Sequence, residues 1–281
     1  MKTINIVFLI LLFETSILAQ VATTCDNADI EADIFYSKGT KNLFSGSLIC
    51  SYKSGLTESE GKIKEGKKEG LWITYWDGYG KKDELNYVNG ISEGPFITYF
   101  KEGEVSSKGF YAKGRFNGPH ESYFKTGKIE RKCVYVNGLL EGKIYSYNEE
   151  GVLIREQSFK NGEEEGVQYT FNNKGIKIME IGYKDGDEFK DGTYAIWNDE
   201  GIQTCLGHYK MGIKVGVWKT WYDTGILSSV SYYDNKGNLK SVSYYDNKGN
   251  LKGKKETYFK NGNLETKAAV LMKTGNTSYV E

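Results

Sequence analysis

The chain has 281 residues, and its 37 Lys and Arg balance 37 Asp and Glu, so that it carries no formal net charge. This balance removes the broad electrostatic attraction that proteins use for nucleic acid or for an anionic membrane surface, and we expect neither as a partner. Glycine (34) and tyrosine (22) are abundant, whereas there are only 2 prolines. Turn-forming glycines together with β-favouring aromatic residues indicate an all-β protein.

The N-terminus resembles a secretory signal peptide. Lys2 precedes an apolar run from Ile4 to Phe13, and small residues surround Ala19. The run is shorter than the roughly 20 residues that a spanning helix needs. We therefore predict a signal peptide over residues 1–19 rather than a buried helix or a membrane anchor. The protein is expected to be exported (periplasmic, outer-membrane-associated or extracellular), with no transmembrane segment after signal removal.

Export permits disulfide bonds, and the chain has four cysteines. Cys25 and Cys50 both lie near the N-terminal edge of the repeats described below and are candidates for a disulfide. Cys133 and Cys205 are three repeats apart, which is further than a disulfide spans. There is no Cys-x-x-Cys motif and no Cys/His cluster, and we predict neither a metal site nor a cofactor.

From residue 46 the sequence repeats with a period of 24 residues, lengthened once to 26 by the segment from Asp187 to Asp191. Each copy reads as strand, turn, strand, turn, which predicts one β-hairpin per copy. Residues 20–45 form an irregular lead-in or cap, the array covers residues 46–265, and residues 266–281 are expected to form a C-terminal cap strand. The boundary glycines that begin the copies are Gly46, Gly70, Gly94, Gly118, Gly142, Gly166, Gly192 and Gly216.

Two positions in each copy are aromatic. One is the fifth residue after the boundary glycine, and the other stands near the end of the second strand. Because the strands are adjacent, we expect the two sets to stack into continuous ladders that supply burial in a single sheet. The fifth residues are Tyr75, Tyr99, Tyr123, Tyr147, Phe171, Trp197, Trp221 and Tyr258, and the second-strand residues are Tyr87, Tyr111, Tyr135, Phe159, Tyr183 and Tyr209.

The second and sixth residues of each copy should point away from the fifth, because side chains alternate along a strand. These residues are aromatic near both ends of the array and mostly polar in the middle, as at Gln168. If exposed, they form two aromatic patches around a wetter centre, a typical interaction surface; twist or a bulge would bury them instead. The candidate binding surface is Trp72, Trp76, Phe96, Phe100, Phe124, Trp218 and Tyr222.

Residues 229–240 and 241–252 are identical twelve-residue segments, each half a repeat long. A second copy that joins the sheet adds one strand and reverses the direction of every later strand, whereas one that does not join forms a protruding arm. The alternation of Val242 and Tyr244 is typical of a strand and favours the first outcome.

The copy that runs from Gly94 through Phe96, Tyr99 and Gly103 resembles the MORN repeat in its variant form, and the copy that begins at Gly216 does so again. The resemblance covers roughly residues 46–265. It implies an elongated, twisted antiparallel sheet, a solenoid-like ladder of tandem β-hairpins. Bacterial proteins with such repeats are often labelled YwqK-type antitoxins of toxin–antitoxin systems. For an exported chain, the resemblance implies an immunity-like role against an envelope-acting toxin.

The sequence offers no catalytic set. His120 and His208 are the only histidines and lie about four repeats apart, and no Ser-His-Asp order or phosphate loop is present. We therefore predict a non-enzymatic exported protein-binding module or scaffold, antitoxin-like or immunity-like, with a protein partner. Carbohydrate or peptidoglycan binding through exposed aromatics is the alternative, and a hydrolase is a distant one. Open sheet edges add edge-mediated self-association as a further expectation.

Overall fold

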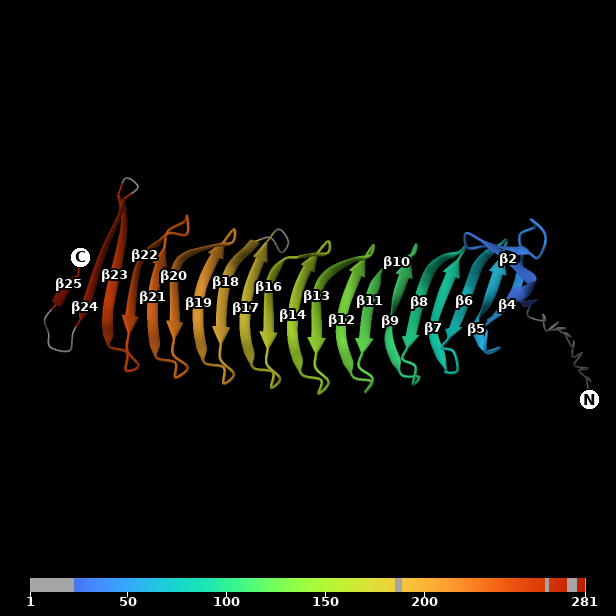
Figure 1. Ribbon diagram of the computed structural model, residues 1–281, viewed down its shortest axis with the longest axis horizontal. Coiled ribbons are helices and arrows are strands. Elements are labelled where there is room, and N and C mark those ends of the chain that lie inside the picture. The colour runs from blue at the N-terminus through green and yellow to red at the C-terminus, as the bar shows by residue number, and fades with distance from the viewer. Residues whose placement is uncertain (1–22, 185–188, 261–262, 272–276, 281) are drawn as a thin grey trace, which may run out of the picture.

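The computed structural model describes residues 23–184, 189–260, 263–271 and 277–280, and the predicted signal peptide over residues 1–19 lies outside them. Within these ranges the regular elements are strands apart from a single 3-10 turn, η1 (Cys25–Asn27). One 23-stranded sheet runs the length of the molecule, and its strands stand side by side in chain order (Figure 1). The predicted all-β ladder of tandem hairpins is confirmed.

Each repeat contributes a first and a second strand. The first strands are β4 (Gly46–Ser51), β6 (Lys67–Tyr75), β8 (Ile91–Tyr99), β11 (Gly118–Tyr123), β13 (Leu139–Tyr147), β16 (Gly166–Phe171), β18 (Phe189–Trp197) and β20 (Ile213–Trp221). The second strands are β5 (Thr57–Lys64), β7 (Lys81–Val88), β9 (Val105–Ala112), β12 (Ile129–Val136), β14 (Leu153–Lys160), β17 (Lys177–Lys184), β19 (Gln203–Lys210) and β21 (Leu227–Tyr233). The short β10 (Arg115–Phe116) and β15 (Glu163–Glu164) precede β11 and β16. The ends are formed by β1 (Thr23–Thr24), β2 (Ala28–Glu31) and β3 (Ile34–Ser37), and by β22 (Leu239–Tyr245), β23 (Leu251–Lys260), β24 (Asn263–Leu271) and β25 (Thr277–Val280).

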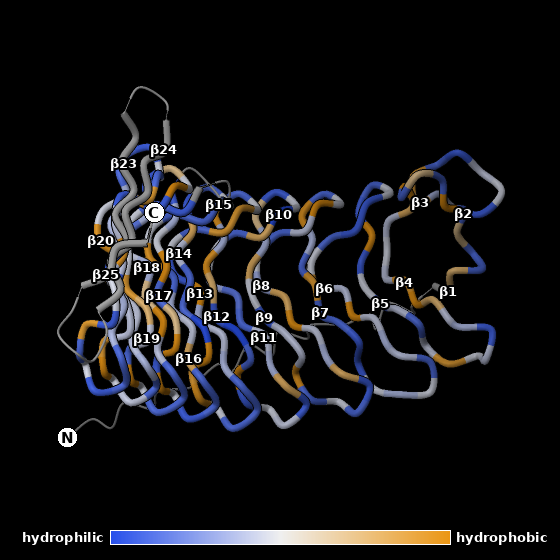
Figure 2. Tube along the Cα trace, turned by 60° about the vertical axis from the view of Figure 1, so that its left-hand side comes forward, coloured by the Kyte–Doolittle hydropathy of each residue, from blue (hydrophilic) through white to orange (hydrophobic). Residues whose placement is uncertain are grey.

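Two kinds of turn alternate along the array, and hydrophilic residues gather in them (Figure 2). Between hairpins, Asn89 and Gly90 both have positive φ, 53° and 83°, as a two-residue type I′ turn requires. Within a hairpin the turn is longer. The amide of Gly103, at φ 105°, donates to the carbonyl of Phe100 at 3.0 Å. The period of glycines in the sequence is therefore a period of turns.

The two faces of the sheet differ in chemistry. We call one the aromatic face, because it carries the second residue of each first strand, such as Phe96, and the second-strand aromatic, such as Tyr111; their ring centroids are 5.0 Å apart. We call the other the charged face. There the hydroxyl of Tyr99, a fifth residue, donates to the carboxylate of Glu84 at 2.9 Å.

This arrangement corrects the predicted ladders, because the fifth residues and the second-strand aromatics lie on opposite faces. Phe96 pairs with Gly109 on β9, and Tyr111 lies two residues beyond Gly109, so that alternation places Tyr111 beside Phe96. A register shift between Thr98 and Tyr99 follows. The second-strand aromatics therefore stack on the second residues. Side chains beyond residue 254, including that of Tyr258, lie outside the described part.

A single sheet buries these rings because side chains cover them and because glycines lie beneath them. The ring of Phe116, two residues before a boundary glycine, lies 5.4 Å from that of His120 and 5.2 Å from that of Tyr135. At the equivalent place Lys214 extends its Nζ 4.3 Å from the centre of the Trp218 ring, with its apolar stem along the surface. An alanine Cβ at Gly207 would approach the Trp218 ring to less than 3.0 Å. Glycine at this position therefore gives the indole its place.

The second copy of the twelve-residue segment forms β22, which pairs antiparallel with β21 and with β23. The duplication thus adds one strand to the sheet. The two identical segments present opposite faces, because Val230 lies opposite Ser243 whereas Ser231 lies opposite Val242. Strand β23, which begins like a first strand at Gly253, consequently runs in the direction of the second strands.

The N-terminal lead-in covers the start of the aromatic face. The β2–β3 hairpin places Phe35, 5% exposed, in one cluster with Leu48, Ile63 and Trp72. A disulfide joins Cys25 to Cys50 in β4, with the two Cα atoms 4.8 Å apart. Residues 23–45 therefore act as a cap that protects the first rings of the array from solvent.

Candidate interaction surfaces

The seven residues of the predicted binding surface fall in two different places. The second residues Trp72, Phe96 and Trp218 are only 2%, 4% and 5% exposed, so the expectation that they form exposed patches is wrong. Their rings lie over glycines of the neighbouring strand and under side chains such as Lys68, whose Nζ is 4.6 Å from the centre of the Trp72 ring. These residues belong to the core of the sheet.

The sixth residues Trp76, Phe100 and Phe124 are half-buried along the edge formed by the longer turns, and Tyr222 is 38% exposed there. Their rings bridge one turn to the next. The indole of Trp76 donates to the carbonyl of Tyr99 at 3.3 Å, and the hydroxyl of Tyr222 donates to that of Tyr245 at 2.8 Å. These four side chains therefore hold the spacing between turns.

The middle of the array is polar for structural reasons. At the sixth position Asn172 accepts hydrogen bonds from the amides of Lys174 and Ile176, both at 3.0 Å, and closes its own turn. Gln168, on the aromatic face, is only 5% exposed and bonds both backbone groups of Ser158. The expected wetter centre is thus not found at Gln168.

The charged face carries an exposed apolar row that the sequence analysis missed. We call it the apolar stripe: Leu71, Pro95, Phe110, Pro119 and Val134. Pro95 pairs with Phe110 and Pro119 with Val134 across neighbouring strands. Leu71, Phe110 and Val134 are 46%, 47% and 40% exposed. The stripe contains both prolines of the chain, and their spacing of 24 residues was the available sequence signal.

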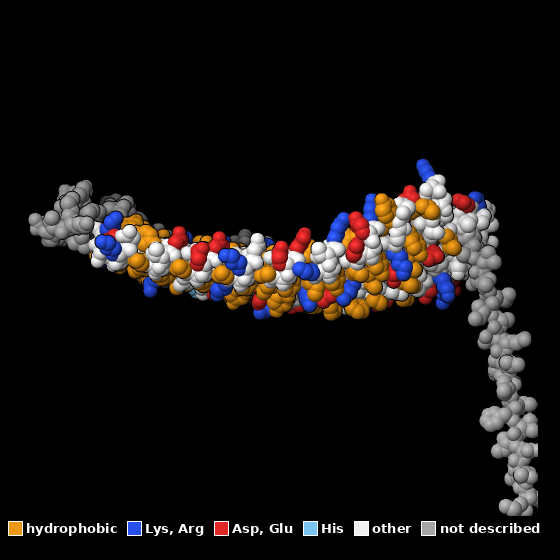
Figure 3. Space-filling model, turned by 90° about the horizontal axis from the view of Figure 1, so that it is seen from below, with side chains coloured by type: hydrophobic (Ala, Val, Ile, Leu, Met, Phe, Trp, Pro, Cys, Tyr) orange, Lys and Arg blue, Asp and Glu red, His pale blue; other side chains and the backbone are white. Residues whose placement is uncertain are grey.

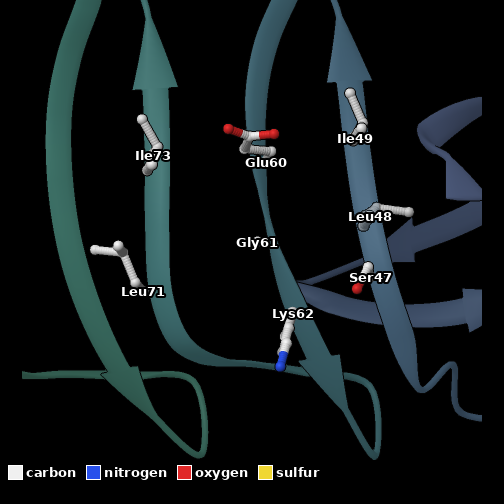
Figure 4. Close-up of a pocket in the computed structure, with 8 residues that line it drawn as sticks. All are labelled: Ser47, Leu48, Ile49, Glu60, Gly61, Lys62, Leu71 and Ile73. Carbon is white, nitrogen blue, oxygen red and sulfur yellow. The ribbon is translucent and has the colours of Figure 1, made fainter. Parts of the chain in front are cut away.

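Two depressions open on the charged face along this stripe. One, of about 280 Å³, lies around Gly61 between β4, β5 and β6, with Leu71 and Ile73 on one side and Glu60 and Lys62 beside the glycine (Figure 4). The other, of about 350 Å³, lies around Gly109, at the same position two repeats later. It is lined by Pro95, Phe96, Ile97, Lys108, Gly109, Phe110, Pro119 and Glu121.

The charges beside the stripe neutralise one another. Glu121 pairs with Lys108 at 3.1 Å and with Lys132 at 3.7 Å. The hydrogen bond from the Tyr123 hydroxyl, together with Lys108, lowers the pKa of the Glu121 carboxyl, so that it stays ionised at neutral pH. Hydrophobic side chains interspersed with such charges are prominent over the N-terminal half of the molecule (Figure 3). The stripe is thus an apolar strip bordered by paired charges.

His120 and Cys133 form the one close histidine–cysteine contact in the described ranges, with Nδ1 and Sγ 3.9 Å apart. Burial lowers the pKa of His120 and raises the pKa of the Cys133 thiol. Both groups are therefore neutral near pH 7, and the pair lacks the thiolate that nucleophilic chemistry needs. His208 is exposed on the charged face, opposite Thr193.

Two searches of the described residues concern other kinds of site. No group of three or more His, Cys, Asp or Glu side chains is placed to hold a metal ion in the described ranges. The same ranges contain no helix with the length and apolar character needed to cross a membrane.

Comparison with known proteins gives one family match. No curated protein sequence matches the chain. Similar solved structures include the crystal structure of TcdB2-TccC3 (11% identity, 87% of this chain and 16% of that chain, TM-score 0.17). Another is TcdB2-TccC3-Cdc42 (11% identity, 87% and 15%, TM-score 0.16). The chain thus spans about one sixth of the length of these proteins, and the similarity is too low to support any inference. The profile of the MORN repeat variant matches residues 116–137, 140–161 and 214–235. Those three segments, each folded across the short turn that links two hairpins, are MORN repeats of the variant type.

Proposed function

We propose that this protein is a non-enzymatic protein-binding module that docks a partner on the apolar stripe of its charged face. The observation that carries the proposal is the row of five exposed apolar side chains that continues across strands β6 to β12. An exposed apolar strip with a polar border is the usual anatomy of a protein interface. MORN repeats are commonly protein-binding repeats, which agrees with this use.

The geometry favours a partner segment of limited charge. The stripe spans six strands, and five strand spacings correspond to about 24 Å, the length of roughly seven extended residues. The two depressions, around Gly61 and Gly109, would accept apolar side chains of the partner. Because Lys108 and Lys132 are already paired with Glu121, an uncharged segment loses least on docking.

The test compares partner recovery by three proteins: wild type, Phe110→Ser/Val134→Ser and Tyr232→Ser. Tyr232 occupies the same repeat position as Phe110 and is 48% exposed, but it lies outside the stripe. After quantitative crosslinking in envelope fractions, the partner should be enriched by wild type and Tyr232→Ser and lost by the double variant. Circular dichroism checks that all three are folded. Equal recovery by all three proteins would contradict the proposal.

We further propose that the protein works in the cell envelope, where an immunity-like partner would be an envelope-acting toxin. The signal-like residues 1–19 and the Cys25–Cys50 disulfide support export, because stable disulfides are typical of oxidising compartments. Thiol labelling of the full-length chain in fractionated cells tests this. We expect protein in the envelope or medium with two labelled cysteines, Cys133 and Cys205, after denaturation. Cytoplasmic protein with four labelled cysteines would contradict export.

A further inference from the structure

The largest of the depressions described here, about 560 Å³, lies near the centre of the array on the aromatic face. Arg131 reaches it from β12 and Asn148 from the turn after β13. Arg131 lies two residues before Cys133 on the same strand, which places both on the aromatic face. The lining residues are Ser122, Phe124, Glu130, Arg131, Ser146, Tyr147, Asn148, Glu149 and Ile154.

Two donors in this depression have no partner. The Nε of Arg131 and the Nδ2 of Asn148 are two of the three buried side-chain polar atoms without a hydrogen bond among the described residues. A buried donor without an acceptor costs about 1–3 kcal/mol, and more when it is charged. A ligand oxygen that entered the depression would relieve this cost at both atoms, which makes the depression a built acceptor site rather than a packing defect.

A second arginine extends the site. Ser146 lies between Arg131 on one neighbouring strand and Arg155 on the other, so the two arginine Cα atoms are about 10 Å apart, two strand spacings. Arg155 lines an adjoining depression of about 180 Å³ together with Gln157 and Gln168. These are two of only three arginines in the chain, at the same position of consecutive repeats.

The positive charge here is not neutralised by the protein. Neither arginine forms an ion pair within the described part of the chain. The Arg131 charge adds to burial in lowering the pKa of His120. A planar guanidinium prefers a carboxylate or phosphate, which it can bind through two parallel hydrogen bonds.

The other lining groups narrow the ligand. Glu130 and Glu149 would repel a densely charged polyanion, but their carboxylates accept hydrogen bonds from hydroxyl groups. The hydroxyls of Ser122 and Ser146 can donate and accept, and Phe124 and Tyr147 offer apolar ring surface. We propose that this site binds an acidic sugar, with Arg131 holding the carboxylate, Asn148 and the two serines holding hydroxyls, and Arg155 meeting the next carboxylate of an oligosaccharide. The site lies on the face opposite the apolar stripe and does not depend on it.

The experiment measures binding of tetragalacturonate and of tetramannuronate to the mature full-length protein by calorimetry. Neutral cellotetraose and the acidic peptide tetraglutamate serve as comparison ligands. We expect at least one uronate to bind, cellotetraose and tetraglutamate to bind at least tenfold more weakly, and Arg131→Gln to weaken the uronate by about 10- to 100-fold, the loss expected of a charged hydrogen bond. The matched control Arg115→Gln removes the third arginine, which lies outside the site, and should bind like wild type.

Two further variants separate binding from folding. Asn148→Asp keeps the Oδ1 acceptor that closes the turn with the Val152 amide at 2.8 Å, but replaces the Nδ2 donor and should weaken the uronate. Arg131→Gln removes an unsatisfied buried donor, so its unfolding midpoint should equal or exceed that of wild type, whereas a structural role would lower it. Failure of both uronates to bind, equal uronate binding by Arg131→Gln, or tighter binding of tetraglutamate or cellotetraose would each overturn the proposal.

Discussion

Replacing Gly207 with alanine tests whether the aromatic face is the core of this sheet. An alanine Cβ at this position would lie less than 3.0 Å from three atoms of the Trp218 ring, a distance that real Cβ atoms essentially never show. The ring cannot move aside easily. It is 5% exposed and is enclosed by Tyr194, Tyr209 and Tyr233 at centroid distances of 5.6, 5.1 and 6.4 Å.

The expected loss follows from two opposing terms. Overpacking of a well-packed core costs about 1–3 kcal/mol. Glycine in a strand is otherwise about 0.5–1 kcal/mol less favourable than alanine, and the substitution recovers that amount. We therefore expect Gly207→Ala to lower the free energy of unfolding by about 1–2 kcal/mol. If Trp218 were an exposed binding residue instead, the same change would be neutral or stabilising.

Urea unfolding followed by far-UV circular dichroism measures the total, and hydrogen exchange of β18 to β21 localises it, because repeat arrays can open in parts. Trp218→Leu removes the obstacle, so Gly207→Ala in that background should cost less than in wild type. Ser231→Ala, at the equivalent position on the other side of Trp218, serves as the matched control and should stay within about 0.5 kcal/mol of wild type. An unchanged or raised free energy of unfolding for Gly207→Ala would refute the packing argument.

Two further predictions concern single hydrogen bonds. The indole of Trp72 donates to the carbonyl of Lys62 at 3.0 Å, whereas the indole nitrogen of Trp218 is buried without a partner. Trp72→Phe should therefore cost about 1 kcal/mol more in urea unfolding than Trp218→Phe, and a smaller cost at Trp72 would count against this accounting. The hydrogen bond between Tyr75 and Glu60, 2.6 Å long, raises the pKa of Tyr75 to about 12, compared with about 10 in the unfolded chain. The folded state thus keeps a proton that the unfolded state releases, and stability should fall as the pH rises from about 10 to 12. Tyr75→Phe should show a shallower fall of the unfolding midpoint over that range, and identical slopes would sink the assignment.

The sequence alone determined the architecture, because hairpins depend on local rules. Turn glycines such as Gly90 and Gly103 require a positive φ, and their period of 24 residues specifies one hairpin per copy. The same local logic gave the added strand β22, since Val242 and Tyr244 alternate as strand residues do. The two half-sites also leave a trace in the sequence, because Pro95 and Pro119, like Arg131 and Arg155, recur at the repeat distance.

Only the tertiary structure decided which side chains are buried and which are available. Alternation correctly separates Phe96 from Tyr99, but it cannot say that Phe96 is the one that packs. That outcome depends on a glycine across the strand, on Phe116 folding over the face and on the register shift before Tyr99, which are contacts between copies rather than within one. The apolar stripe and the arginine depression arise in the same way, since neighbouring strands bring together residues about a repeat apart. A repeat sequence specifies its hairpin, and the stacking of hairpins specifies its surfaces.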